Sequence, residues 1–423
     1  MTLKRQITKL PRDTGVTGWN AILGLAPSYP EAEGDISADW LVIGGGFAGL
    51  SAAKRLCELR GGDRIMLLEA ARIGEGPAGR NSGFMIDLPH ELSGDGYAGS
   101  ADSDRLQISL NRHAQNFARS CAAEYEMPAE AVSPIGRING AVNARGEAHN
   151  NAYAAQLDTL GEAHTKLSAT EMAEMTGTDT YRSGLFLPGA VMLQPALYIR
   201  EMAAGLASRE KTPVSIFEAS PATGFSREGE SWKVTTPKAT VTAGKIVMAV
   251  NGHAESFGFF RQRLMHVFTY ASMTTALNGE QQVRLGGLPA WGITPADPMG
   301  STVRRHTGIG AAGSLSATAG RSIRRWRLTR RASRGSAATM KRRSGAASRC
   351  WPASISNIAG VDGCACRAIR CRPLARSSRA CSRPAARTGL ARRRARWPAS
   401  ARSSWRRGRT RRLCRICCPM MRR

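Results

Sequence analysis

The residues with the clearest chemical purpose are the glycines of GGGFAG (44–49), which follow the spacing G-x-G-x-x-G. At this spacing Gly44 allows a tight turn, Gly46 lets the backbone approach a pyrophosphate, and Gly49 lets a helix pack closely on a strand. The spacing by itself is weak evidence, because glycine clusters also form ordinary turns. Its meaning therefore depends on the elements and the charged residue that flank it.

An acidic residue stands where a dinucleotide site needs one. Glu69 lies twenty residues after Gly49, and its carboxylate can accept hydrogen bonds from both ribose hydroxyls while repelling a 2′-phosphate. Phe47 and Ala48 open a predicted helix, whose unpaired N–H groups and partial positive charge attract the pyrophosphate. The alternative is a turn-forming glycine cluster with a surface glutamate. We favour the dinucleotide-binding site because spacing and flanking elements agree.

The elements around these residues predict a βαβ unit. The apolar run WLVI (40–43) is typical of a buried parallel strand, and residues 47–59 have the pattern of a helix with small residues on one side. RIMLLEA (64–70) predicts a second strand, which ends at Glu69. The unit has about the length of the βαβ motif in a Rossmann-type fold.

The segment after Glu69 favours FAD over NAD. AARIGEGPAGRNSGFM (70–85) leaves little room for a regular crossover helix, and here the sequence resembles the D-amino-acid-oxidase-like FAD oxidoreductases, most nearly the γ-glutamylputrescine oxidoreductase branch. In that family an acidic residue ends the second strand, and a loop close to GxGASGRNGGF passes under the flavin. Pro77 and Ala78 depart slightly from this loop, and the residues that match it are Gly74, Gly76, Gly79, Arg80, Asn81, Gly83 and Phe84. An NAD-dependent dehydrogenase with the same βαβ unit is the alternative, and this loop argues against it.

The resemblance, which spans roughly residues 20–310, also implies which residues contact FAD. The segment 193–225, predicted as a helix followed by a strand, would contact the adenine near Pro221. KIVMAVNGH (245–253) is similar to a later strand and turn that pass the cofactor, although by itself it is only a turn signal. For Arg80 and Asn81 the alternative is a solvated turn. The residues expected at the cofactor are Gly44, Gly46, Phe47, Ala48, Gly49, Glu69, Ala70, Arg80, Asn81, Gly83, Ala222, Ala249, Asn251 and Gly252.

The predicted fold class is α/β. A Rossmann-type FAD-binding domain is assembled from the discontinuous segments 37–100 and 190–258, and an inserted α+β substrate domain comprises 101–189 and 259–310. Residues 1–36 are polar and rich in Gly and Pro, so we expect an extended lead-in with little core of its own.

Composition changes sharply near residue 310. Residues 311–423 contain 31 of the 60 Lys and Arg residues and a single acid, Asp362, whereas residues 1–310 contain 29 basic and 31 acidic residues. Only one of the 31 basic residues is a lysine, and the set of Arg, Ala, Ser, Gly, Pro, Cys and Trp is what GC-rich codons encode in a shifted frame. The glycine-rich loop and final helix of the family are not recognisable there. We therefore predict a frameshifted C-terminal region, disordered or non-native, with a genuine basic tail as the alternative.

The motifs of the tail favour no second site. Cys364, Cys366, Cys371, Cys414 and Cys417 lack the regular paired spacing of a zinc module, so we expect no metal. The arginine runs would bind phosphate backbones through charge without reading a base sequence, which gives a nucleic-acid-binding protein as the alternative function.

The cysteines and the hydropathy of the chain indicate where in the cell the protein is located. Cys57 and Cys121 are the only cysteines before residue 311, which suits a reducing compartment. The first thirty residues lack the apolar region of a signal peptide, and no apolar run approaches the roughly 20 residues of a membrane span. We expect a cytoplasmic protein without a membrane span.

By resemblance, the chain oxidises the C–N bond of a small amine or amino acid. A hydride passes from the carbon beside the nitrogen to flavin N5, the imine hydrolyses, and oxygen or an electron carrier accepts the electrons. Because the cofactor carries this chemistry, no lone acid–base residue is required, and we assign no catalytic residue. Three histidines are candidate active-site groups, but a surface or core role is expected for each of His90, His253 and His266. Nothing in the local sequence distinguishes Arg261 or Tyr270.

The reading-frame hypothesis is tested on the DNA. We expect resequencing across the codons for residues 300–320 to reveal a missing or an extra base, whose correction restores a Gly-rich, Arg-poor C-terminus. A frame confirmed as written would mean that the basic tail is genuine.

Overall fold

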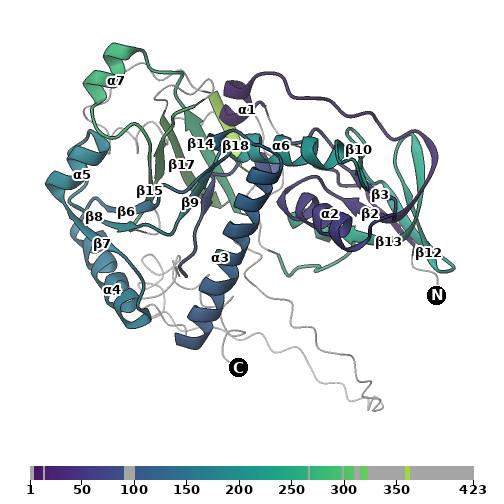
Figure 1. Cartoon of the computed structure of the whole chain (residues 1–423), viewed down its shortest axis with the longest axis horizontal. Coiled ribbons are helices and arrows are strands. Elements are labelled where there is room, and N and C mark those ends of the chain that lie inside the picture. Colours follow the sequence, from purple (N-terminus) through teal and green to yellow (C-terminus); the bar gives the residue numbers. More distant parts are fainter. Residues whose placement is uncertain are drawn as a thin grey trace, which may run out of the picture. The chain divides into compact units, whose positions relative to one another are not determined.

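A computed structural model of the chain describes residues 4–12, 15–89, 101–264, 267–297, 300–308, 315–322 and 358–362 (Figure 1). All of these belong to one compact unit, Met1–His90 together with Gly96–Arg370. A second unit, Glu91–Asp95 with Cys371–Arg423, lies outside the described residues.

The first sheet has seven strands in the order β1-β11-β12-β13-β2-β3-β10. Four of them are parallel neighbours: β13 (Ala239–Met248), β2 (Gly34–Ile43), β3 (Ile65–Leu68) and β10 (Ser215–Phe217). The other three extend the sheet in antiparallel fashion: β1 (Lys4–Gln6), β11 (Gly224–Glu228) and β12 (Ser231–Thr235). The βαβ unit is present as β2, α2 (Phe47–Leu59) and β3, and the α/β fold class is confirmed.

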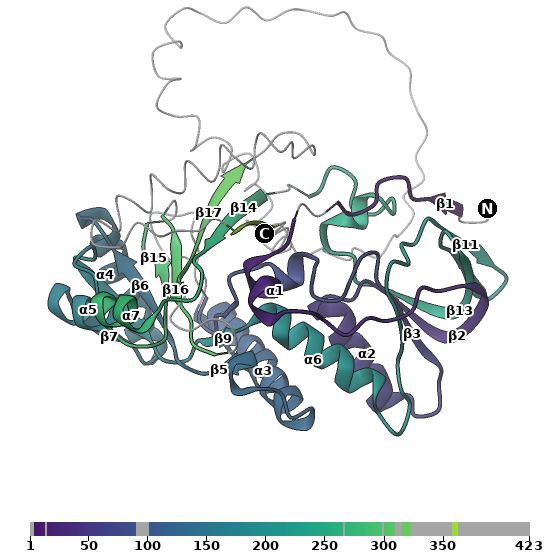
Figure 2. The same cartoon turned by 90° about the horizontal axis from the view of Figure 1, so that it is seen from above.

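Both faces of the parallel strands are buried, because their apolar residues alternate between two cores. Val42 faces a core formed with α2, α6 (Pro195–Ala207) and part of α3 (Ala101–Glu124), whereas Leu41 and Ile43 face the opposite core. This explains the unbroken apolar runs of the strands, since parallel strands covered on both faces need no polar alternation. Helices α2 and α6 lie side by side on one face (Figures 1 and 2).

A second sheet of eight strands has the order β18-β14-β17-β16-β15-β6-β8-β7. Its strands are β6 (Arg137–Ala141), β7 (Thr165–Ser168), β8 (Ser183–Leu187), β14 (Val267–Met273), β15 (Trp291–Pro295), β16 (Thr302–Arg305), β17 (Leu315–Ser322) and β18 (Ile358–Asp362). The accompanying helices are α4 (Ala144–Leu160), α5 (Ala169–Thr176) and α7 (Gly279–Leu285). A small sheet joins β4 (Phe84–Met85), β9 (Val191–Leu193) and β5 (Val132–Ser133).

Helix α3 crosses the predicted boundary between the two domains. Near its C-terminal end, Ala118 and Cys121 pack in the core beside α2 and α6, whereas Ile108 packs with Tyr153 and Leu157 of α4. The division into FAD-binding and substrate domains stays a prediction. Among the described residues no helix, α3 included, is both long and apolar enough to cross a membrane.

Two segments differ from the sequence-based expectation. The lead-in 1–36 contains a short helix, α1 (Gly18–Leu23), whose Trp19 and Asn20 are buried. In the C-terminal region, β17 and β18 both pair with β14 although their sequence shows no strand periodicity. Ladder bonds are made by backbone N–H and C=O groups, so such pairing needs no side-chain pattern. The remainder of 311–423, with its five cysteines noted above, lies outside the described residues.

A buried lysine joins the helices that cover the parallel sheet. Lys54 of α2 is 3% exposed and contacts Glu58 at 2.9 Å and Glu124 of α3 at 2.5 Å. Burial alone would lower the pKa of Lys54, but hydrogen bonds to Glu124 and Glu58 more than offset it and raise this pKa. Burial likewise opposes the lowered pKa of Glu124, which the hydrogen bond from Lys54 produces.

Replacing the buried lysine tests this network. We expect Lys54→Met to lower the free energy of unfolding by about 1 kcal/mol at pH 7, a modest loss because Glu58 and Glu124 are partly open to water. Glutamates with a lowered folded-state pKa stabilise above their unfolded pKa, so the difference should shrink as the pH falls below about 4. Urea unfolding at pH 7 and below about pH 4 measures this difference, with Lys233→Met, at a side chain that is 43% exposed, as the matched control. A loss independent of pH would contradict the assigned cause.

Candidate functional site

The carboxyl ends of the four parallel strands lie on one line. Ile43 is paired with Leu68 and Met248, and Leu68 with Phe217. The residues that follow these strand ends therefore meet at one edge of the sheet. The chain leaves β2 toward β3 on one side and later adds β13 on the other, which makes the gap between β2 and β13 a switch point where α/β sheets bind ligands.

The glycine turn at this switch point has no space for side chains. Gly44 has φ +108° and a Cβ there would lie 2.4 Å from the Ala249 carbonyl oxygen. A Cβ on Gly49 would lie 1.8 Å from the Gly44 carbonyl oxygen. The predicted tasks of both glycines, a tight turn and close packing of helix on strand, are thus visible in the backbone.

The start of α2 is open to a ligand. Gly46 occupies the N-cap position with extended backbone, and no side chain caps the helix. Ala48 is exposed and Phe47 half-buried, its ring 6.1 Å from that of Tyr198. Since the first amides of a helix have no intrahelical acceptor, those of this turn are available to an anion.

Glu69 is fixed beside the glycine turn. Its Oε2 accepts a hydrogen bond from the Gly45 N–H at 2.8 Å, and its Oε1 accepts one from the Ala71 N–H at 3.0 Å. A carboxylate has about four lone-pair sites, so both oxygens keep the capacity to accept from hydroxyl groups. Ala70, next in the chain, is half-buried. This arrangement suits a ribose.

The loop 74–83 is folded by its own polar residues. The buried Arg80 donates from Nε to the Glu75 carbonyl at 2.5 Å and from Nη2 to the Gly15 carbonyl at 2.8 Å. Asn81 donates to the Ala78 carbonyl at 2.6 Å and accepts from the Gly83 N–H at 2.7 Å. Asn81 therefore shapes the loop from within, and Arg80 also joins it to Gly15. Their predicted contact with the cofactor stays a prediction.

The two later segments reach the same edge. The Ser220 N–H donates to the Glu69 carbonyl at 2.9 Å, which brings the buried Ala222 close to the predicted ribose site. Ala249 adjoins the glycine turn, Gly252 is buried, and Asn251 has φ +48°. Within the described part of the chain, the buried Oδ1 of Asn251 has no hydrogen-bond partner. The structure thus brings the glycine turn, Glu69, 220–222 and 249–252 to one sheet edge, whereas Arg80, Asn81 and Gly83 make hydrogen bonds within the loop and to Gly15 and Leu193.

Comparison with known proteins agrees with this geometry. The sequence model of the family "FAD dependent oxidoreductase" (DAO) matches residues 39–385. The chain belongs to this family. The matched range extends beyond residue 310, where the motif-based resemblance ended.

Individual relatives cover less of the chain. "Probable oxidoreductase OrdL" of Rhizobium meliloti (strain 1021) is 25% identical over 66% of this chain and 64% of its own length. "Gamma-glutamylputrescine oxidoreductase" of Escherichia coli (strain K12) is 46% identical over 52 residues, 12% of each chain. The chain thus spans less than two thirds of the length of these relatives. The glycine oxidase structure from Geobacillus kaustophilus aligns with TM-score 0.58 at 15% identity, over 77% of this chain and 82% of that one, and shows the shared fold.

A buried arginine that sequence reasoning missed lies next to the loop of this DAO-family protein. Arg304 of β16 donates from Nη1 to the carbonyls of Ser82 at 2.7 Å and Leu193 at 2.8 Å. Its guanidinium lies over the rings of Trp19 at 5.2 Å and Phe84 at 5.6 Å. Burial lowers the pKa of Arg304 to about 9, so it remains charged at neutral pH. Nothing in the short segment STVRRH (301–306) identifies this role.

His306 shares this environment. Its ring meets that of Trp19 edge-on, with centroids 4.6 Å apart. Burial, together with the charge of Arg304, holds the pKa of His306 well below its usual value. The imidazole is therefore neutral at pH 7, which leaves Arg304 as the cation of the pair.

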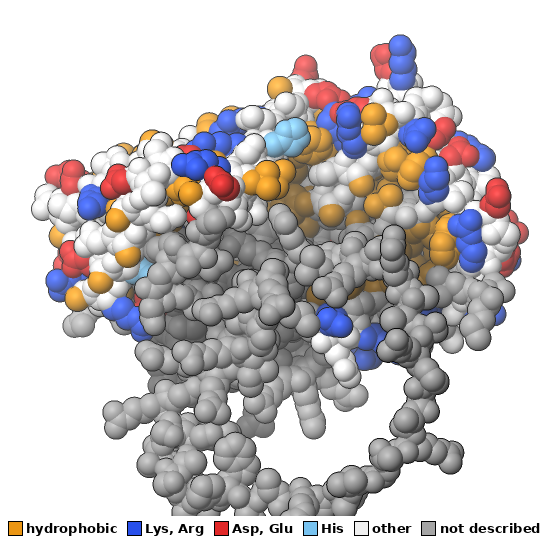
Figure 3. Space-filling model, turned by 90° about the horizontal axis from the view of Figure 1, so that it is seen from below, with side chains coloured by type: hydrophobic (Ala, Val, Ile, Leu, Met, Phe, Trp, Pro, Cys, Tyr) orange, Lys and Arg blue, Asp and Glu red, His pale blue; other side chains and the backbone are white. Residues whose placement is uncertain are grey.

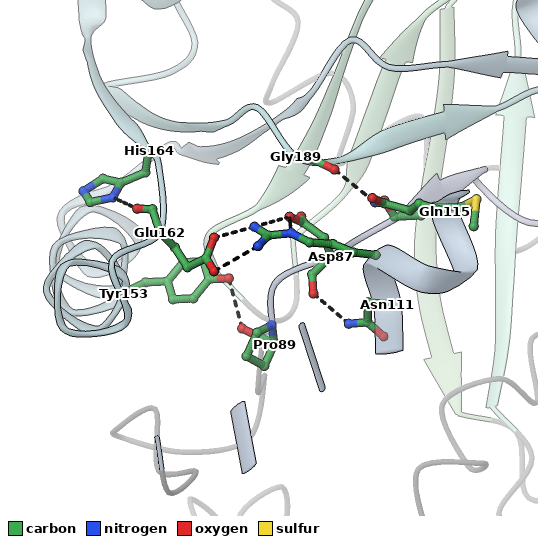
Figure 4. A network of polar contacts seen from close by, with 10 residues as sticks. Asp87, Pro89, Asn111, Gln115, Tyr153, Glu162, His164 and Gly189 are labelled. Carbon is green, nitrogen blue, oxygen red and sulfur yellow. Dashed lines mark hydrogen bonds and ion pairs between the residues drawn. The ribbon is translucent and has the colours of Figure 1, made fainter. Parts of the chain in front are cut away.

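A polar network holds the chain just beyond β4 (Figure 4). Asp87 is 1% exposed and accepts two hydrogen bonds from Arg112 of α3, at 3.3 and 3.2 Å. Gln115 of the same helix donates to the carbonyls of Met85 at 2.9 Å and Gly189 at 3.0 Å. The network ties the residues after the loop to α3. Sequence analysis did not single out any of them.

The other candidate side chains stay unassigned. His253 is half-buried in the 3-10 turn Asn251–Glu255, Tyr270 is buried on β14, and Arg261 is exposed. His90 and His266 lie outside the described residues.

The glycine turn can be tested with a matched pair of substitutions. We expect Gly44→Ala to abolish FAD binding and to lower the free energy of unfolding by more than about 1 kcal/mol, because it adds a Cβ at positive φ against a carbonyl. Gly61→Ala, with nothing within 4 Å of its Cβ, should bind FAD normally. Flavin absorbance of the purified proteins and thermal unfolding measure both. Normal FAD content in Gly44→Ala would exclude this turn as the site.

Proposed function

We propose that this DAO-family chain is an FAD-dependent oxidoreductase that oxidises the C–N bond of a small amine or amino acid. The observation that carries the proposal is the meeting of the glycine turn, Glu69, 220–222 and 249–252 at a single sheet edge. Because these glycines have no side chains, the turn leaves a space that a Cβ would fill. This space favours the binding of a pyrophosphate at the turn.

The residues present fit the parts of FAD in order along this edge. The start of α2 with Gly46 would hold the pyrophosphate, and the Glu69 carboxylate would accept from the ribose hydroxyls. The backbone near Ala222 would contact the adenine. Ala249, Asn251 and Gly252 would line the opposite side, and the loop 74–83 would lie beneath the flavin.

For the proposed reaction the protein must bind and orient the substrate and exclude water from the reacting atoms. When bound, the flavin supplies a hydride acceptor at N5 for the carbon beside the substrate nitrogen, and the released imine hydrolyses to a carbonyl compound and an amine. Oxygen or an electron carrier takes up the two electrons. The substrate class is supported by the name of the relative gamma-glutamylputrescine oxidoreductase, whereas the loop 70–85 supports the cofactor.

The alternative function, nucleic-acid binding, depends on the arginine runs of the tail, which lie outside the described residues, and it stays a prediction. Residues 1–310 are nearly neutral, with 29 basic and 31 acidic residues. Figure 3 shows side chains of both signs interspersed on the described part of the face that it draws. A protein surface that binds nucleic acid usually concentrates positive charge in a patch or stripe.

The proposal is tested by flavin reduction. We expect the purified chain to carry FAD and, without oxygen, to lose its absorbance near 450 nm on addition of a primary amine or an amino acid, with release of ammonia. A matched 2-hydroxy acid should leave the absorbance unchanged, because it has no C–N bond. Reduction by the hydroxy acid alone would overturn the substrate class, and a protein that binds no FAD would overturn the proposed function.

A further inference from the structure

The segment before the first parallel strand runs along the sheet edge that carries the candidate site. In its first part α1 packs on α6. In its second part the Tyr29 N–H donates to Glu218 Oε2 at 3.1 Å and the Ala32 N–H donates to Ser220 Oγ at 2.9 Å. Residues 15–32 are thus attached at several places, which an extended lead-in would not require.

Three hydrogen bonds connect this segment to the loop 74–83. The Trp19 indole N–H donates to the Asn81 carbonyl at 2.9 Å, and the Asn20 side-chain amide donates to the Gly74 carbonyl at 2.9 Å. In the opposite direction, Arg80 Nη2 donates to the Gly15 carbonyl at 2.8 Å. The bonds reach the beginning and the end of the loop.

The segment is itself held by the surrounding helices and strands. Trp19 is 6% exposed, the guanidinium of Arg304 lies over its ring, and the ring of His306 meets it edge-on. Asn20 is 6% exposed, and its Oδ1 accepts from Arg200 Nη2 of α6 at 2.8 Å. Trp19 and Asn20 are therefore held in place by the rest of the fold, and their hydrogen bonds hold the loop in turn.

The loop needs such support. Between β3 and β4 the described chain has no regular element except the three-residue turn Pro77–Gly79, and Gly74 and Gly83 both have positive φ. Glycine-rich backbone loses much conformational entropy on ordering, and a site that is ordered before binding has higher affinity.

We propose that residues 15–32 form a strap that completes the cofactor site by holding the loop 74–83 in its binding shape, with Trp19 and Asn20 as positioning residues. The proposal rests on the proposed function, because it assumes that FAD binds against this loop. It assigns the segment a part in cofactor retention that its sequence does not indicate.

The test uses Trp19→Phe, which keeps the ring but removes the N–H, and Asn20→Ala. Matched controls remove the same kinds of bond elsewhere: Trp40→Phe loses a bond of 3.0 Å to Asp63, and Asn150→Ala one of 2.9 Å to the Asn139 carbonyl. FAD affinity is measured by flavin fluorescence on the full chain, and hydrogen–deuterium exchange of the loop 74–83 is followed in the FAD-free protein.

We expect the two strap variants to weaken FAD binding about three- to tenfold, as loss of one hydrogen bond implies, and to speed exchange in the loop. The controls should change neither quantity. Loop exchange and affinity that match those of the controls would overturn the strap. If the parent chain binds no FAD, the proposed function fails, yet loop exchange still decides whether the strap fastens the loop.

Discussion

The close approach of backbone to backbone at the glycine turn is the constraint on which the cofactor site depends. A Cβ at Gly44 would meet Ala249, and one at Gly49 would meet Gly44 itself. Only without these atoms can α2 begin directly at the end of β2 while β13 lies alongside. The open amides of α2 and the Glu69 carboxylate then lie at the same turn, an arrangement that suits the pyrophosphate and the ribose of a dinucleotide.

Buried guanidinium groups hold the surroundings of this turn by binding backbone carbonyls. Arg80 joins Glu75 to Gly15, and Arg304 joins Ser82 to Leu193. Elsewhere, beside the second sheet, Arg305 binds the Leu288 carbonyl at 2.9 Å in the same way. Irregular segments have carbonyl groups that no ladder or helix satisfies, and arginine carries five donors in a rigid fork. One side chain can therefore fix two loop segments at once, although each buried cation costs desolvation, as the lowered pKa of Arg304 shows.

The composition of the chain misleads when it is averaged. The net charge of +28 is the sum of +30 in residues 311–423 and −2 in residues 1–310, so the part that contains the candidate site is close to neutral. In the described part of the C-terminal region, β17 and β18 add to the second sheet through backbone pairing with β14. This pairing is compatible with an unusual composition, because a ladder constrains side chains far less than a packed core does.

The sequence alone determined the βαβ unit, the turn at Gly44–Gly49, the carboxylate at Glu69 and the family, because these depend on spacing within short stretches. The tertiary structure decided the rest. Trp19 reaches Asn81 across 62 positions and Arg304 reaches Ser82 across 222, distances at which no periodicity or motif connects two residues. No sequence motif identifies Asp87 either, because its role depends on Arg112 of a helix that folds back beside it. Local spacing encodes the elements of the candidate site, and contacts between distant segments decide how these elements are held.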